Sequence, residues 1–421
     1  MKELFANKRD CCGCELCSQV CPVSIIEMKQ DAEGFFYPTV TVPDRCVGCG
    51  RCEKVCPMKQ RIIPHREFLA SYTGFANNEA DIKKSASGGV CTILSRLIID
   101  RNGVVYGVSY SDNCQVIRYK RATSIQELES FRGSKYAQAR KKDIYNHVMS
   151  DLKDNKMVLF IGLPCDVAAL YNFTRNDFSN LYTIELVCHG VTSPKVHEQF
   201  VLKEARENCS PMLDFSVRYK KKGWKPYFVY EKFENGIEII KPFERTPYNT
   251  AFTYLKRPSC NCCKFKAYDK EYGLQADMTV GDNHGVMPDS ISYNKWGSSV
   301  LFVHSTKGQE LIDCLKDVFA ANDETASLNE LIRQNLALYK AVPEQKNRSL
   351  FLNVFQTKGL ESSNRIFRIK CARLKNRIIS TLKTPIIYLY VKSGLRNHKT
   401  ICVRVLGIFI PKYRRARISK P

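Results

Sequence analysis

Apolar positions along most of the chain follow two periods, and they predict a body that mixes helices and strands. Residues 90–99 carry apolar side chains at helical spacing, and Asn102-Gly103 then marks a turn before an apolar strand at 104–106. Two further stretches, 157–161 and 181–187, are continuous apolar runs of the length typical of buried strands. The pattern therefore predicts a mixed α/β fold for the central part of the chain.

Three predicted strands end in turns that carry polar or thiol groups. The strand at 157–161 precedes Cys165, the strand at 181–187 precedes Cys188-His189-Gly190, and a third at 277–280 precedes Gly281-Asp282. Open α/β sheets place their sites at the carboxyl ends of strands. We therefore expect functional residues in these turns.

The first 60 residues hold instead an internal repeat of cysteines. Each copy reads C-x-x-C-x-x-C-x-x-x-C-P, the run of bacterial two-cluster ferredoxins, in which the fourth cysteine ligates the other cluster. A pair of zinc knuckles is the alternative, but zinc needs only four thiolates and favours paired C-x-x-C units. The spacing thus predicts two 4Fe-4S clusters, held by Cys11, Cys14, Cys17 and Cys56 and by Cys46, Cys49, Cys52 and Cys21. Cys12 is a ninth thiol outside the pattern, for which we expect no role.

Composition restricts where such a chain works. A secreted disulfide scaffold would be short and would begin with an export signal, whereas this chain has 421 residues and its N-terminus goes straight into cysteines. No run of apolar residues is long enough for a transmembrane helix. We expect a cytoplasmic protein whose 20 cysteines serve metal and redox chemistry.

The net charge of +23 belongs mostly to the tail. Residues 362–421 contain 16 Lys or Arg and no Asp or Glu, so the rest of the chain carries only +7. Apolar residues from Phe367 to Leu382 recur at helical spacing, which predicts an amphipathic basic helix. Such a helix suits an anionic membrane surface or an acidic partner, and packing on its own domain is the alternative. Nucleic-acid binding is not expected, because the tail lacks a stacking platform or a groove-reading module.

The order and spacing of several short motifs carry a family resemblance. Over roughly residues 1–300 the sequence resembles the beta-subunit family of coenzyme F-420 (deazaflavin) hydrogenases and dehydrogenases, to which plant hydroxymethyl chlorophyll reductase is also similar. Its motifs are Ser87-Gly88-Gly89-Val90, Gly133-Ser134-Lys135-Tyr136, Gly162-Leu163-Pro164-Cys165, Cys188-His189-Gly190-Val191, Ser193-Pro194-Lys195, Lys222-Gly223-Trp224, Arg257-Pro258-Ser259-Cys260, Cys263-Lys264 and Gly281-Asp282. The resemblance implies an oxidoreductase with iron–sulfur clusters and FAD. Two aromatic residues usually follow Gly-Asp in the family, but this chain has Asn283-His284, so its substrate can differ.

Four cysteines outside the repeat form a candidate third cluster. Cys165, Cys188, Cys260 and Cys263 lie on three turns that we expect to converge, and four thiolates can hold one more cubane. The resemblance points the same way, since family members without the ferredoxin module still carry a cluster. A zinc site and plain core thiols remain the alternatives. Cys262 could also replace Cys263 as a ligand.

Two glycine-containing motifs are candidate FAD contacts. Ser87-Gly88-Gly89 precedes an apolar helix whose N-terminus could hold a phosphate, while Gly133 and Ser134 lead into the cation of Lys135 and the ring of Tyr136. A helix cap with a flexible turn is the plainer reading of the first motif. We further expect His189 and Asp282 at the reaction centre, His189 as a proton donor or only as a hydrogen-bonding residue within its turn.

Iron–sulfur clusters pass single electrons, whereas organic reductions usually need a hydride, and a flavin can connect the two. We therefore expect an oxidoreductase that passes electrons between ferredoxin-type clusters and a hydride partner through FAD. A non-catalytic electron-transfer subunit that docks a separate enzyme is the alternative. In either case the partner is a redox protein or a small electron carrier. The expected parts are a ferredoxin-like domain (1–62), an FAD-binding region (63–150), a region with the inner cluster and active site (151–347), and a basic helical tail (348–421).

Overall fold

The computed structural model describes residues 4–62, 64, 66–175, 178–266, 274–315 and 328–367. The chain divides into two compact units, 1–364 and 365–421. Residues 348–364 of the first unit are helical, while the tail positions beyond 367, including the predicted amphipathic helix, lie outside the described residues. The four-part division predicted from the sequence stays a prediction.

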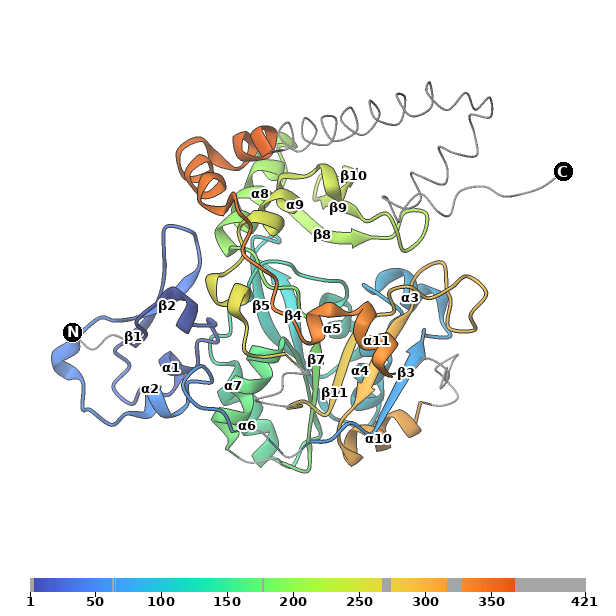
Figure 1. The fold of residues 1–421 in the computed structure, drawn as a ribbon, viewed down its shortest axis with the longest axis horizontal. Coiled ribbons are helices and arrows are strands. Elements are labelled where there is room, and N and C mark those ends of the chain that lie inside the picture. Colours follow the sequence, from blue (N-terminus) through green and yellow to red (C-terminus); the bar gives the residue numbers. More distant parts are fainter. Residues whose placement is uncertain are drawn as a thin grey trace, which may run out of the picture. The chain divides into compact units, whose positions relative to one another are not determined.

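A seven-stranded mixed sheet forms the body of the first unit (Figure 1). In spatial order its strands are β3 (Ala70–Gly74), β12 (Ser299–Val303), β11 (Met278–Asp282), β7 (Leu181–Leu186), β6 (Val158–Gly162), β4 (Val104–Ser111) and β5 (Val116–Ala122). Strands β4, β6, β7 and β11 run parallel, and the other three are antiparallel to their neighbours. The strands predicted at 104–106, 157–161, 181–187 and 277–280 are thus confirmed as β4, β6, β7 and β11. Their carboxyl ends lie at one edge, because parallel strands point the same way.

Helices cover both faces of this sheet. In chain order, the helices of the body are α3 (Glu79–Lys84), α4 (Val90–Asp100), α5 (Ile125–Leu128), α6 (Ile144–Lys153), α7 (Pro164–Thr174), α8 (Pro194–Glu207), α9 (Pro247–Tyr254), α10 (Thr306–Asp313) and α11 (Leu328–Gln334), and α9 packs on α8. Helix α4 matches the helix predicted at 90–99. Helices α7 and α8 begin at a proline, whose fixed φ and missing N–H suit the first helical turn.

Alternate residues of each central strand serve different cores. Tyr106 and Phe160 face the side covered by α6 and α7, whereas Val105 and Leu159 face the side covered by α4 and α10. This alternation is what the two-residue period of a strand imposes. Leu16 of the N-terminal module joins the first of these cores, so the module is packed onto the α6–α7 side.

Two smaller sheets complete the described unit. The N-terminal module contains α1 (Leu16–Gln19), α2 (Arg51–Lys54) and the hairpin β1 (Ile26–Gln30) and β2 (Phe36–Val40). A separate antiparallel sheet of β8 (Met212–Tyr219), β9 (Phe228–Phe233) and β10 (Glu238–Pro242) had no counterpart among the sequence predictions. Among the helices of the described residues, none is both long and apolar enough to cross a membrane.

Candidate functional site

The two cysteine runs share one backbone conformation. Gly13 and Gly48, at the same position of each repeat, have φ of 71° and 65°. Glu15 and Gly50 likewise have φ of 63° and 67°, and each directly precedes a four-residue helix. Left-handed residues between closely spaced cysteines turn the chain sharply, so each run wraps around a centre instead of continuing as a strand or helix. The repeat in sequence is thus a repeat in structure.

The first predicted ligand set lies at the junction with the body. Contact with the Cys12 thiol lowers the pKa of Cys14, but burial and the charges of Cys17 and Cys56 raise it. Burial, then the charges of Cys11 and Cys56, raise the pKa of Cys17. The four cysteines Cys11, Cys14, Cys17 and Cys56 therefore lie within electrostatic range of one another, as one cubane requires.

The second predicted ligand set lines a single pocket. Its wall includes Cys21, Cys46, Cys49 and Cys52, together with apolar residues such as Ile26. The fourth cysteine of the first run thus faces three cysteines of the second run. This is the crossed arrangement expected of a two-cluster ferredoxin.

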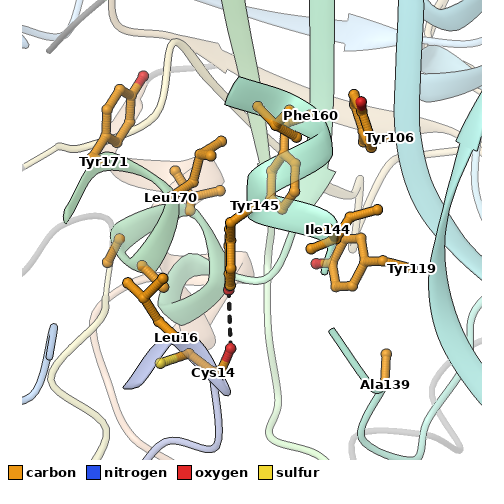
Figure 2. Close-up of a cluster of buried hydrophobic side chains, with 14 of the residues drawn as sticks. Cys14, Leu16, Tyr106, Tyr119, Ala139, Ile144, Tyr145, Phe160, Leu170 and Tyr171 are labelled. Carbon is orange, nitrogen blue, oxygen red and sulfur yellow. Dashed lines mark hydrogen bonds between the residues drawn. The ribbon is translucent and has the colours of Figure 1, made fainter. Parts of the chain in front are cut away.

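Polar contacts tie the first cysteine run to the body. The hydroxyl of Tyr145 on α6 donates to the carbonyl of Cys14 at 3.2 Å, and Figure 2 shows this bond beside the packed side chain of Leu16. Gln138 Nε2 donates to the carbonyl of Cys12 at 2.9 Å, and Lys141 Nζ donates to the carbonyl of Gly13 at 3.3 Å. The backbone around the first ligand set is therefore fixed by side chains of the α/β body.

Arg257 makes another of these contacts, and its side chain is fully buried. Its Nε donates to the carbonyl of Cys11 at 2.9 Å, and its Nη2 lies 3.4 Å from Cys11 Sγ. The guanidinium also lies 4.2 Å from the centre of the Tyr37 ring. Because Arg257 stands three residues before Cys260, it connects the ferredoxin thiols to the inner thiols.

The four inner cysteines are brought together as the sequence predicts. Burial and then the charge of Cys188 raise the pKa of Cys260 to about 12, with Cys263 and Cys165 adding smaller effects. Burial also raises the pKa of Cys263 to about 12, with contributions from Cys165 and Cys188. The exposed Cys262 instead directs its thiol at the carbonyls of its own turn. We call Cys165, Cys188, Cys260 and Cys263 the inner thiol set.

Cys12 lies between the ferredoxin thiols and the inner thiol set. The neighbouring Cys14 thiol and then burial raise the pKa of the buried Cys12 thiol, and the Cys165 thiol acts to lower it. The Cys12 thiol, together with burial, raises the pKa of Cys165. Cys12, for which the sequence predicts no role, thus lies close to both sets.

Buried cations surround the inner thiol set. Lys256, Lys266 and Lys141 are each 3–7% exposed. Lys266 Nζ donates to the carbonyl of Cys188 at 2.9 Å. Burial lowers the pKa of Lys256 to about 8, against the charges of Cys260 and Cys188. Four thiolates around an iron–sulfur cubane carry net negative charge, so these ammonium groups fit such a group.

Among the residues described, no three His, Cys, Asp or Glu side chains are arranged to hold a single metal ion.

The residues of the first candidate FAD motif make hydrogen bonds and close packing contacts within the protein. Gly88 N donates to Ser299 Oγ at 2.9 Å, and a Cβ on Gly88 would lie 2.5 Å from the carbonyl oxygen of Gly74. The hydroxyl of Ser87 donates to the carbonyl of Ser298 at 2.6 Å. Gly89, with φ of 96°, is the residue before α4 and makes no side-chain cap. The start of α4 therefore fits a phosphate better than the amide of Gly88 does.

The second candidate FAD motif is also engaged in contacts. Lys135 Nζ donates to the carbonyls of Arg132 at 2.7 Å and of Ser130 at 3.1 Å. Gly133 has φ of 77°, and Ser134 follows it in the same half-buried turn. The ring of Tyr136 stacks on that of Phe252 with 4.4 Å between ring centres. Lys135 thus stabilises its own loop. The ring of Tyr136 lies near the charged residues Arg218 and Asp282.

That pair consists of Asp282, at the end of β11, and Arg218 of β8. Arg218 Nη2 lies 2.8 Å from Asp282 Oδ2 and its Nη1 lies 3.3 Å from Oδ1. Despite burial, Arg218 holds the pKa of Asp282 below its ordinary value. A carboxylate kept ionised in this way orients a cation, and it is a poor proton donor near neutral pH.

His189 follows β7 at the same edge of the sheet. Its crowded surroundings and the charges of Lys256 and Lys266 lower the pKa of His189, although part of the ring is exposed to solvent. His284 and Asp282 also act on its pKa, so the structure brings His189 near Asp282. The imidazole is neutral at physiological pH, with a nitrogen that can accept a proton.

Several residues that shape these sites are not predicted from the sequence pattern. Arg218 stands within a strand of the sheet that was not predicted, and Lys256 and Lys266 are single cations near the C-x-x-C pair. Arg257 was noted only as part of a family motif. Its position directly before Pro258 and close to Cys260 was the one available signal.

The fold and these thiol sets define the chain as an iron–sulfur oxidoreductase. Residues 10–60 match the family described as 4Fe-4S dicluster domain, and residues 155–325 match the family that describes the C terminus of the coenzyme F420 hydrogenase/dehydrogenase beta subunit. The chain therefore carries a 4Fe-4S dicluster module at its N-terminus, followed by a region that matches the C terminus of the coenzyme F420 hydrogenase/dehydrogenase beta subunit.

The chain was also compared with solved structures and with curated proteins. A chain from the structure of the F420-reducing [NiFe] hydrogenase complex of Methanosarcina barkeri is similar at 17% identity and a TM-score of 0.42, over 64% of this chain and 90% of that chain. None of the curated proteins compared matches the chain.

Proposed function

We propose that this protein passes electrons between its ferredoxin-type clusters and a hydride partner by way of an inner cluster and FAD. The observation that carries this proposal is the position of the buried Cys12, whose thiol acts on the pKa of both Cys14 and Cys165. A ferredoxin module used only to dock another enzyme would not need its buried thiols joined to a second thiol set. The position of Cys12 instead favours a route for electrons from the ferredoxin ligand sets into the α/β body.

Each set of residues has a part in this proposal. The two ferredoxin sets would hold clusters that exchange single electrons, and the inner thiol set would hold a third. The buried lysines Lys256 and Lys266 would offset the negative charge of a third cluster and so favour its reduced form, whereas Lys141 is paired with Asp166 at 3.1 Å.

The proposed FAD lies at the carboxyl edge of the parallel strands. The N-terminus of α4, preceded by Gly89, would hold a phosphate, and the Tyr136 ring would border the site. FAD supplies the exchange between single electrons and a hydride. Arg218, oriented by Asp282, presents a fixed positive charge, and His189 can take up or release the accompanying proton. The hydride partner is a deazaflavin, a nicotinamide or an organic substrate.

Analysis of iron, sulfide and flavin in anaerobically purified protein tests the proposal. We expect about 12 irons per chain, from three 4Fe-4S clusters, and about one extractable FAD. Full iron loading without any flavin would favour the other candidate, an electron-transfer subunit without its own reaction.

A further inference from the structure

The two cysteine runs of the N-terminal module have opposite surroundings. In the first run, Cys12 and Cys14 are buried and their carbonyls accept hydrogen bonds from the body. In the second run, every residue from 42 to 49 is exposed. A Cβ added to Gly48 or Gly50 would meet no atom of the described residues within 4 Å. The second ligand set thus lies at the surface of the described unit.

Apolar side chains are exposed beside these thiols. Val47, between two predicted ligands, is 63% exposed, and Val42 is 41% exposed. The pocket lined by the second ligand set opens among residues of this same loop. Exposed apolar residues around a redox centre are typical of a surface that becomes covered when a partner docks.

The rim of this surface is basic. Arg45, Arg51 and Lys54 are exposed around the loop. Of the two acidic residues nearby, Glu53 is paired with Lys59 at 3.4 Å, which leaves Asp44 as an exposed carboxylate among three exposed cations. A partner that docks here with complementary charge is therefore acidic.

We propose that residues 42–54, the docking surface, bind an acidic protein that carries a one-electron redox centre. In each encounter the reduced carrier loses one electron and the second cluster gains it, or the reverse, and no bond forms or breaks. Clusters held by the two ferredoxin ligand sets and by the inner thiol set would supply the route for the electron between this surface and the body. This inference rests on the proposed function and adds to it the point of exchange and the class of partner.

The test measures binding, not turnover. Full-length holoprotein is titrated with an oxidised acidic two-cluster ferredoxin in a calorimeter, at low and at moderate salt. The variant Arg45→Glu/Arg51→Glu/Lys54→Glu should bind at least tenfold more weakly at low salt, and its affinity should no longer fall as salt is raised, because attraction becomes repulsion. The matched control Lys153→Glu/Arg206→Glu/Lys358→Glu makes the same change in net charge at exposed positions outside the module, and it should bind as the parent does.

A second variant tests the apolar part of the surface. Val47→Ser keeps every charge and should weaken binding while the salt dependence stays that of the parent. Iron content equal to that of the parent shows that each variant has a folded module. The proposal is overturned if the Arg45→Glu/Arg51→Glu/Lys54→Glu variant binds like the parent, or if the control loses as much affinity.

The outcome also separates this inference from the proposed function. Flavin and iron are counted in the same preparations. Carrier binding that depends on residues 42–54 in a protein without flavin supports the docking surface and removes the FAD proposal. Flavin-loaded protein whose carrier binding does not depend on residues 42–54 supports the FAD proposal and overturns the docking surface.

Discussion

Arg257 Nη2 lies 3.4 Å from Cys11 Sγ, although 246 positions separate the two residues in the sequence. The guanidinium is fully buried and also donates to the carbonyl of Phe36 at 3.2 Å. A positive charge this close to a cluster ligand stabilises the more negative, reduced form of the cluster. The body of the protein therefore influences the electronic properties of the ferredoxin module.

This relationship predicts a change in one reduction potential. Arg257→Gln should make the potential of the first cluster more negative, by on the order of 60 mV, which corresponds to about 1.4 kcal/mol for one electron. Arg257→Lys keeps the charge and should shift it less. Redox titration followed by electron paramagnetic resonance measures both, and Arg206→Gln, at an exposed position, serves as the control. Equal potentials in parent and Arg257→Gln would contradict the prediction.

A second prediction concerns the inner thiol set. Cys263→Ser should remove about four irons per chain and leave the signals of the ferredoxin module in place. The charge of Cys188 raises the pKa of Cys263, whereas the neighbouring Cys262 is exposed and directs its thiol at carbonyls of its own turn. Cys262→Ser is therefore the matched control and should keep its iron. Iron and sulfide analysis decides the matter, and unchanged iron in the double variant would remove the third cluster.

The sequence predicted those parts of the site that depend on local spacing. The cysteine repeat and the apolar runs of β4, β6, β7 and β11 are local signals, and the structure confirms those strands. Arg218 and Arg257 could not be found in this way, because their partners Asp282 and Cys11 are distant in sequence.

Gly88 shows a different limit of sequence reading. A glycine-rich turn before a helix suggested free amides for a phosphate. In the structure, the close carbonyl of Gly74 already requires a glycine at this position. A sequence pattern cannot separate a residue that makes room for a ligand from one that makes room for the neighbouring strand.

A third prediction concerns Glu185, a fully buried carboxyl of β7. Burial raises its pKa to about 7, although Gln275 and Thr279 donate to its oxygens at 3.1 and 3.0 Å. Since the pKa is higher in the folded protein than in the unfolded chain, the contribution of Glu185 to stability is fully present below about pH 4 and declines as pH rises to about 7.

Glu185→Gln removes this titration. The variant should therefore gain stability relative to the parent as pH increases from 6 to 8, by about 1 kcal/mol. Guanidinium unfolding of both proteins at the two pH values measures the difference. Glu27→Gln, at an exposed position, should show no such change, and a pH-independent difference for Glu185→Gln would contradict the assigned pKa.

The last prediction concerns the tail, whose residues after 367 lie outside the described part of the structure. Its apolar residues at helical spacing and its 16 cations without a single acid favour an anionic surface, because a merely solvated helix face usually mixes both signs. Each Lys or Arg near an anionic membrane contributes about 1 kcal/mol to binding. Because this attraction is electrostatic, the binding of the tail to the membrane should be weak and sensitive to salt.

Flotation with anionic vesicles compares the full-length protein with a chain that ends at residue 361. Only the full-length protein should float at low salt, and moderate salt should release it, since exposed charges are screened beyond about 10 Å at 0.1 M. Vesicles of neutral lipid are the control for a purely apolar interaction. Equal flotation of both chains would place membrane contact elsewhere in the protein. If neither chain floats at low salt, an acidic protein partner becomes the better interpretation of the tail, and the vesicles should be replaced by that class of ligand.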